Sequence, residues 1–109
     1  MTYSIVKRTV LTIAVLALSG SAAIAADQTV IQKDKSFQPA EITAKAGDTI
    51  TFDNQDVITH NLYSKDAGNE FEFPKQDPGQ KEKLTLKSAG KMTVHCAIHP
   101  KMKLVINVQ

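Results

Sequence analysis

The sequence predicts an all-β protein, a small Greek-key β-sandwich or barrel of about seven strands. Apolar and polar residues alternate in several short stretches, such as "KLTLK" at 83–87, and this alternation is typical of strands with one buried face. Sequences rich in Gly, Asp and Asn separate these stretches, as tight turns require. No stretch shows a sustained helical period. Together, these three observations favour a small all-β domain.

Each expected strand has its own short pattern of alternation. In the stretch at 49–53, for example, Ile50 and Phe52 alternate with polar residues, which predicts one buried face. The seven strands are expected at residues 29–32, 41–45, 49–53, 58–64, 83–87, 91–96 and 103–108. The turns between them are expected at residues 45–48, 65–69, 76–80 and 88–91.

The first 25 residues have the three-part build of an export signal. Lys7 and Arg8 give a positive start, an apolar run follows at 10–18, and Ala23-Ile24-Ala25 ends the segment with small residues at the positions that a signal peptidase reads. The apolar run is too short to span a bilayer, which takes about 20 residues. We therefore expect residues 1–25 to be cleaved and residues 26–109 to form one domain in the periplasm, with no membrane anchor.

Cleavage would leave a small neutral domain with a single thiol. Of the 13 basic residues, Lys7 and Arg8 would be lost, and the remaining 11 would balance the 11 acidic residues. A neutral domain gives no reason to expect a nucleic-acid partner. Cys96 is the only cysteine, so no intramolecular disulfide can form, and an exported thiol is open to oxidation unless it is buried or bound to a metal.

The phase of the strands predicts where the potential metal ligands point. In "KMTVHC" the alternation turns Cys96 toward the core and leaves His95 exposed, and in "ITHNLYS" it turns His60 inward. Residues 97–101 must form a loop because Pro100 lacks a backbone donor. Met102 is expected to open the last strand.

Two imidazoles, one thiol and one thioether make the donor set of a type 1 copper site. In such a site His60, Cys96 and His99 would bind one copper ion, with Met102 as a weak axial ligand. A structural zinc site would have little use for the methionine. Haem c attachment needs a second cysteine, and no stretch is typical of a cysteine hydrolase.

Three stretches carry a resemblance to a known family. "GDTITFDNQDVITHNL" (47–62), "DPGQ" (77–80) and "AGKMTVHCAIHPKMKLVINV" (89–108) are similar to the cupredoxins, most of all to the amicyanin and plastocyanin-like group. The resemblance implies the four copper ligands just named. It also implies that the backbone N–H of Asn61 hydrogen-bonds the thiolate. Ile98 departs from the pattern, because many members of the family have proline there.

The resemblance implies an electron carrier rather than an enzyme. His99 would be the electron port, inside an apolar docking surface formed with Ile98 and Pro100. Lys101, Lys103 and Lys91 would bias docking toward acidic partners. We expect a monomer that exchanges single electrons with redox proteins, such as a dehydrogenase as donor and a cytochrome c as acceptor. The alternative left open is a periplasmic copper carrier or storage protein.

Overall fold

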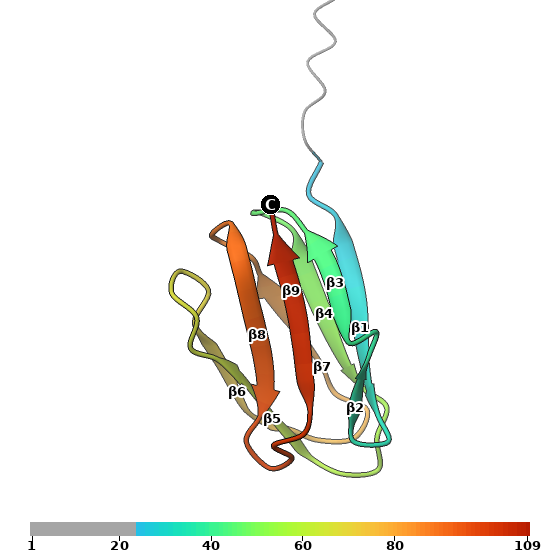
Figure 1. Cartoon of the computed structure of the whole chain (residues 1–109). Helices are drawn as coiled ribbons and strands as arrows, with labels where there is room; N and C mark the ends of the chain where they lie inside the picture. Colours follow the sequence, from blue (N-terminus) through green and yellow to red (C-terminus); the bar gives the residue numbers. More distant parts are fainter. Residues whose placement is uncertain (1–23) are drawn as a thin grey trace, which may run out of the picture.

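Two β-sheets packed face to face form the molecule (Figure 1). The computed structural model describes residues 24–109, and residues 1–23, with most of the expected export signal, lie outside the described residues. No helix among the described residues is long and apolar enough to cross a membrane. The strands are β1 (Asp27–Lys33), β2 (Ser36–Gln38), β3 (Glu41–Ala44), β4 (Thr49–Asn54), β5 (His60–Ser64), β6 (Phe71–Gln76), β7 (Lys81–Thr85), β8 (Gly90–Cys96) and β9 (Lys103–Val108).

The order of the strands confirms the predicted all-β sandwich. One sheet has the order β2-β1-β4-β7 and the other β3-β9-β8-β5-β6. β1 runs parallel to β4 and β3 runs parallel to β9, whereas the other pairs are antiparallel. The chain therefore crosses between the sheets several times, as in a Greek-key sandwich.

The prediction of about seven strands was too low, because the described residues contain nine. The short strand β2 pairs with β1 as a hairpin, and β6 forms an edge of the five-stranded sheet. Pro74 lies within β6, and proline is tolerated at an edge because its missing N–H breaks no hydrogen bond of a central strand. The expected strand at 58–64 begins only at His60, which leaves Ile58 in the preceding loop.

Alternate residues of both sheets fill the space between them. Phe52 in β4 is fully buried, stacks on Phe71 with ring centroids 6.0 Å apart, and meets Phe37 and Phe73 edge-on. β8 and β9 contribute the alternating side chains that the sequence pattern predicts. The buried apolar residues are Val30, Phe37, Ile42, Ala44, Ile50, Phe52, Leu62, Leu86, Met92, Val94, Cys96, Met102, Leu104, Ile106 and Val108.

The two ends of the sandwich carry different features. β1, β4, β6 and β8 all finish at the lower end in Figure 1, where the loops at 55–59 and 97–102 lie together. The upper end holds the start of β1, the turn at 45–48 and the carboxyl end of the chain. The potential metal ligands are thus gathered at the lower end.

Candidate metal centre

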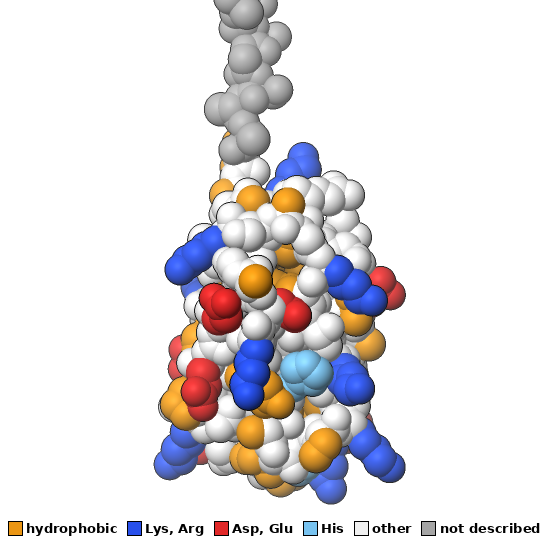
Figure 2. All heavy atoms as spheres, turned by 60° about the vertical axis from the view of Figure 1, so that its left-hand side comes forward, with side chains coloured by type: hydrophobic (Ala, Val, Ile, Leu, Met, Phe, Trp, Pro, Cys, Tyr) orange, Lys and Arg blue, Asp and Glu red, His pale blue; other side chains and the backbone are white. Residues whose placement is uncertain are grey.

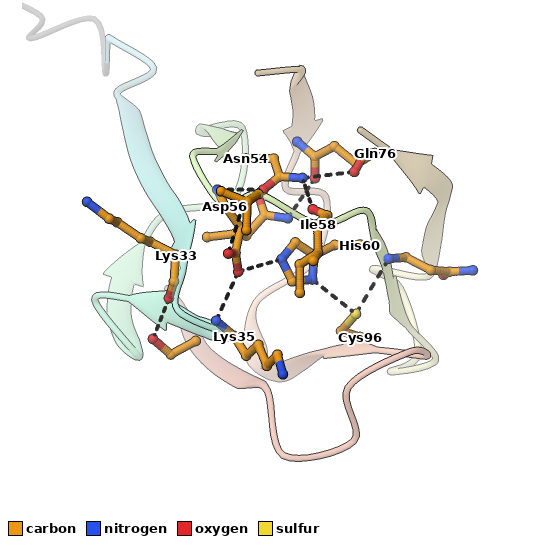
Figure 3. A network of polar contacts seen from close by, with 12 residues as sticks. Lys33, Lys35, Asn54, Asp56, Ile58, His60, Gln76 and Cys96 are labelled. Atoms are coloured by element: carbon orange, nitrogen blue, oxygen red, sulfur yellow. Dashed lines mark hydrogen bonds and ion pairs between the residues drawn. The ribbon is translucent and has the colours of Figure 1, made fainter. Parts of the chain in front are cut away.

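Cys96 and His60 face each other inside the lower end of the sandwich. Cys96 is the last residue of β8, and His60 is the first residue of β5. The two strands are antiparallel, and Cys96 pairs with Leu62, two residues after His60. The thiol is 1% exposed and the imidazole 0%. Cys96 Sγ lies 3.6 Å from His60 Nδ1 (Figure 3). The inward orientation that strand phase predicts for both side chains is present.

The spacing of these two atoms suits a shared metal ion. With metal–nitrogen bonds of about 2.0 Å and metal–sulfur bonds of about 2.3 Å, two donors on one tetrahedral or trigonal ion lie roughly 3.5–3.7 Å apart. The observed separation of 3.6 Å falls in this range.

Asp56 fixes the orientation of the His60 ring. Its Oδ2 lies 3.1 Å from His60 Nε2, so the ring donates its proton there and keeps the Nδ1 lone pair toward Cys96. The same Oδ2 accepts the backbone N–H of Lys35 at 2.9 Å (Figure 3). Oδ1 accepts the backbone N–H of Val57 at 3.0 Å. Sequence reasoning missed this residue.

The ionisation of this pair favours a neutral imidazole and a charged carboxylate. Burial lowers the pKa of His60, although the hydrogen bond and the charge of Asp56 oppose the change. Burial raises the pKa of Asp56, but the N–H groups of Lys35 and Val57 and the contact with His60 outweigh it and hold this pKa below its usual value. A neutral imidazole is the form that binds a metal.

Asn61 approaches the thiol through its backbone. Its N–H points at Cys96 Sγ with an N···S distance of 3.5 Å, and its carbonyl accepts the N–H of Ala97 at 2.9 Å. These two bonds tie the first turn of the 97–102 loop to β5. The side-chain Oδ1 of Asn61 is buried without a hydrogen-bond partner among the described residues.

His99 and Met102 lie in the loop that follows Cys96. The His99 ring is half-buried and its centroid is 5.3 Å from that of His60, while its Nε2 is buried without a hydrogen-bond partner in the described part of the chain. Met102 is 1% exposed and donates its backbone N–H to the carbonyl of His99 at 2.9 Å. Met102 is the residue immediately before β9. The antiparallel register of β8 and β9 ends at the pair His95–Lys103. If this register is continued by one residue, Met102 comes opposite Cys96.

The structure brings the four predicted ligands to one end without forming a complete cluster. Among residues 24–109, no group of three or more His, Cys, Asp or Glu side chains is arranged to hold a metal ion. His60 and Cys96 are the pair in direct contact, and His99 is adjacent to it through the His60 ring.

A buried network of amides supports the loop that carries Asp56. Asn54 Nδ2 donates to the carbonyls of Ile58 and Gln76 at 3.0 and 2.9 Å, and its Oδ1 accepts the N–H of Asp56. Gln76 donates in turn to the carbonyl of Phe52 and accepts from the side chain of Gln32. Figure 3 shows Asn54 between Asp56, Ile58 and Gln76. These fully buried amides could not be distinguished from surface residues in the sequence, because their partners are distant along the chain.

The surface beside His99 is apolar and bordered by lysines. Ile98 is 53% exposed, Pro100 is exposed, and both line a shallow pocket with His99, Lys35 and Lys101. Figure 2 shows hydrophobic side chains between lysines at this lower end of the molecule. No pattern in the sequence pointed to Lys35, which reaches this surface because the β1–β2 turn lies at the same end.

Two expectations about neighbouring residues were wrong. Lys91 lies near the start of β8, at the opposite end of the sandwich from Cys96, so it cannot border the pocket at His99. His95 is half-buried rather than exposed, because its ring stacks on Tyr63 of β5 at a centroid distance of 5.4 Å.

Comparison with known proteins identifies the family of this sandwich. The family model described as "Cupredoxin-like domain" matches residues 8–108, almost the whole chain. The chain belongs to the cupredoxin-like domain family. The fold and the family that the resemblance implied are thus confirmed.

Several known proteins and solved structures are similar to this chain. The methylamine utilization protein MauL of Methylorubrum extorquens is 36% identical over 73 residues, which are 66% of this chain and 64% of that protein. The Cu-containing nitrite reductase NirK of Thermus scotoductus is 29% identical with a TM-score of 0.70, over 76% of this chain and 22% of that one. A reduced Cu(I) form of an amicyanin variant at pH 4 is 26% identical with a TM-score of 0.70, over 76% and 82% of the two chains. This cupredoxin therefore spans less than two thirds of MauL and about a fifth of the reductase.

Proposed function

We propose that this cupredoxin is a periplasmic electron carrier that holds one type 1 copper ion between His60, Cys96, His99 and Met102. The observation that carries the proposal is the buried contact of His60 Nδ1 with Cys96 Sγ at 3.6 Å. One thiol facing one imidazole, with a second imidazole and a thioether in the next loop, is the donor set of type 1 copper.

The residues present fit this ion. The soft thiolate and thioether favour Cu(I), whereas imidazole serves both Cu(I) and Cu(II). His99 offers a buried ring nitrogen, Nε2, that has no hydrogen-bond partner among residues 24–109, and such an orphaned group is explained if it binds a metal. The names of two similar proteins, the nitrite reductase and the Cu(I) amicyanin, also contain copper.

When bound, copper supplies a one-electron couple, and the protein residues control its surroundings. Asp56 holds the His60 ring in one tautomer, so that Nδ1 does not need to lose a proton on binding. The N–H of Asn61 draws electron density from the sulfur of Cys96. The core around the thiol excludes water, which keeps solvent reorganisation small when the charge changes.

His99 and its neighbours form the proposed docking surface. The His99 ring is half-buried, so it connects the interior with the surface that Ile98 and Pro100 cover. We propose redox proteins as partners, such as a dehydrogenase as donor and a cytochrome c as acceptor. Lys35 and Lys101 on the same rim favour acidic partners.

An electron carrier and a copper carrier differ in what they release. The copper-loaded mature protein is mixed with apo-azurin, and copper transfer and electron transfer are followed separately. The electron carrier keeps its copper for hours and exchanges electrons with added cytochrome c within seconds. Loss of copper to the acceptor within minutes, with slow electron exchange, would instead support the copper carrier.

The lysine rim can be tested with a small anionic oxidant. Lys35→Gln and Lys101→Gln should each slow oxidation of the reduced protein by hexacyanoferrate(III) at low salt, and the difference should shrink as salt screens the charges. Lys91→Gln, at the far end of β8, is the matched control and should leave the rate unchanged. Equal effects of all three substitutions would show that only net charge matters and would refute this docking site.

A further inference from the structure

The upper end of the sandwich contains a buried carboxylate that lacks a cationic side-chain partner. Asp48, in the turn between β3 and β4, is 6% exposed. None of the ion pairs among the described residues involves it. Buried charges are normally paired, so this carboxylate requires an explanation.

Both carboxylate oxygens of Asp48 accept backbone N–H groups. Oδ2 accepts the N–H of Lys45 at 2.9 Å, which fixes the side chain within its own turn. Oδ1 accepts the N–H of Ala26 at 2.9 Å, 22 residues away in the sequence. The carbonyl of Ala26 accepts the N–H of Thr49 at 2.9 Å, so Ala26 is held from both sides.

Ala26 is also the residue at which the sequence predicts the mature chain to begin. From these two observations we infer that removal of residues 1–25 creates an α-ammonium on Ala26 that pairs with the carboxylate of Asp48. A signal peptidase would hydrolyse the Ala25–Ala26 peptide bond with one water molecule, leaving a carboxylate on Ala25 and an amine on Ala26. The amine takes up a proton at neutral pH and becomes the missing cationic partner.

Cleavage at this bond removes no buried contact of the described residues. Ile24 is 91% exposed and Ala25 is exposed, and both precede β1. Both sheets lie entirely within residues 27–108. Processing therefore replaces a neutral N–H donor with a charged one at an atom that already contacts the carboxylate, so both members of the hydrogen bond become ionised.

The pKa of Asp48 agrees with a site prepared for a cation. The N–H groups of Lys45 and then of Ala26 lower this pKa below its usual value, more than burial raises it, and the charge of Lys45 adds to the decrease. Other charged side chains at this end include Asp27 in β1, Lys87 after β7 and Lys91 near the start of β8, and the main-chain carboxylate of Gln109 accepts the N–H of Ala46 on the same turn. The carboxylate is thus charged throughout the neutral range.

The first measurement is the mass of the chain after export. The full 109-residue chain is expressed with its own N-terminus, and the periplasmic product should have the mass of residues 26–109. A mature chain that begins at any other residue would overturn the inference.

The second measurement isolates the charge of the new terminus. Metal-free 26–109 is compared with the same chain acetylated at its α-amino group, which keeps an N–H donor but removes the charge. At pH 6 the free amine should unfold at a higher urea concentration, by an amount equal to several-fold in the folding equilibrium constant. In Asp48→Asn the two forms should unfold together. Equal midpoints in the wild type, or a difference that persists in Asp48→Asn, would refute the pairing.

A third measurement decides the matter if Asp48→Asn does not fold. The α-amino group is titrated by NMR in the wild type, where its pKa should lie above the ordinary range of about 7.7–8.0. The stability from the pair should then be complete below that range and disappear as pH rises through the higher value in the folded protein. An ordinary pKa would refute the inference. The mass does not depend on bound metal, and the urea and NMR measurements use metal-free protein, so all three outcomes are independent of the proposed copper function.

Discussion

Removal of the Asp56 carboxylate should damage both the stability of the protein and its metal site. Asp56 is the acceptor for His60 Nε2, for the N–H of Lys35 and for the N–H of Val57. In Asp56→Ala all three donors lose this partner at once. In Asp56→Asn the side chain keeps its shape and one acceptor oxygen, so its effects should be smaller.

The loss of stability in Asp56→Ala arises mainly at His60, because the N–H groups of Lys35 and Val57 can form hydrogen bonds with water instead. Lys35 and Val57 are exposed, whereas the His60 side chain is 0% exposed. A buried donor left without a partner costs about 1–3 kcal/mol, and we expect Asp56→Ala to lower the free energy of unfolding of the metal-free protein by this amount. Loss of the group that orients a metal-binding histidine weakens metal affinity by about 10–100-fold.

Urea unfolding of the metal-free protein measures the loss of stability. Competition for Cu(I) with a coloured chelator measures the loss of metal affinity. Asp66→Ala is the matched control, because Asp66 also accepts a backbone N–H, that of Thr93. Asp66 lies just after β5, at the opposite end of this strand from His60. Asp66→Ala should lower stability and leave copper affinity unchanged. The reasoning is wrong if Asp56→Ala binds copper as tightly as the wild type, or if both substitutions weaken binding equally.

Three shorter predictions concern the turn after β5, the acid stability and the docking surface. Gly68→Ala should lower the melting temperature more than Gly47→Ala: both glycines have positive φ, but only at Gly68 would a Cβ lie 2.5 Å from Ser88 Oγ. Equal losses would show that backbone strain alone matters. The pKa of Asp48 is lowered in the folded protein. The ionised carboxylate should therefore stabilise the fold fully at pH values above its pKa in the unfolded chain, and this stabilisation should be lost as pH falls through its pKa in the folded protein. Below about pH 4, the urea midpoint of Asp48→Asn should thus fall less steeply with decreasing pH than that of the wild type. Ile98→Asp should leave the urea midpoint unchanged, since Ile98 is 53% exposed, but slow electron self-exchange about tenfold by placing like charges face to face; an unchanged NMR self-exchange rate would exclude this surface.

Alternation along single strands was enough to predict most of the fold. It correctly assigned β8 and β9 and turned Cys96 inward, because a strand with one buried face has a period of two that is visible locally. It missed β2, which has three residues, and β6, whose pattern contains Pro74. Short and edge strands depend on pairing with distant segments, which local patterns do not reveal.

The same limit explains what could be predicted at the site. The types and spacing of Cys96, His99 and Met102 are local features, and the copper prediction rests on them. The contact of Asp56 with both His60 and the N–H of Lys35 was hidden, because it depends on where the β1–β2 turn meets the 55–59 loop. Lys91 was misplaced for a related reason, since proximity to Cys96 in the sequence becomes distance along an extended strand.

The most direct test of the copper proposal is a titration of the metal-free mature protein with Cu(II), followed by visible absorption. An intense thiolate-to-copper band near 600 nm, about the region expected for type 1 copper, should grow until one equivalent is bound. The same titration of Cys96→Ser should give no such band. Absence of the band in the wild type, or its survival in Cys96→Ser, would contradict the assignment of Cys96 as the thiolate ligand.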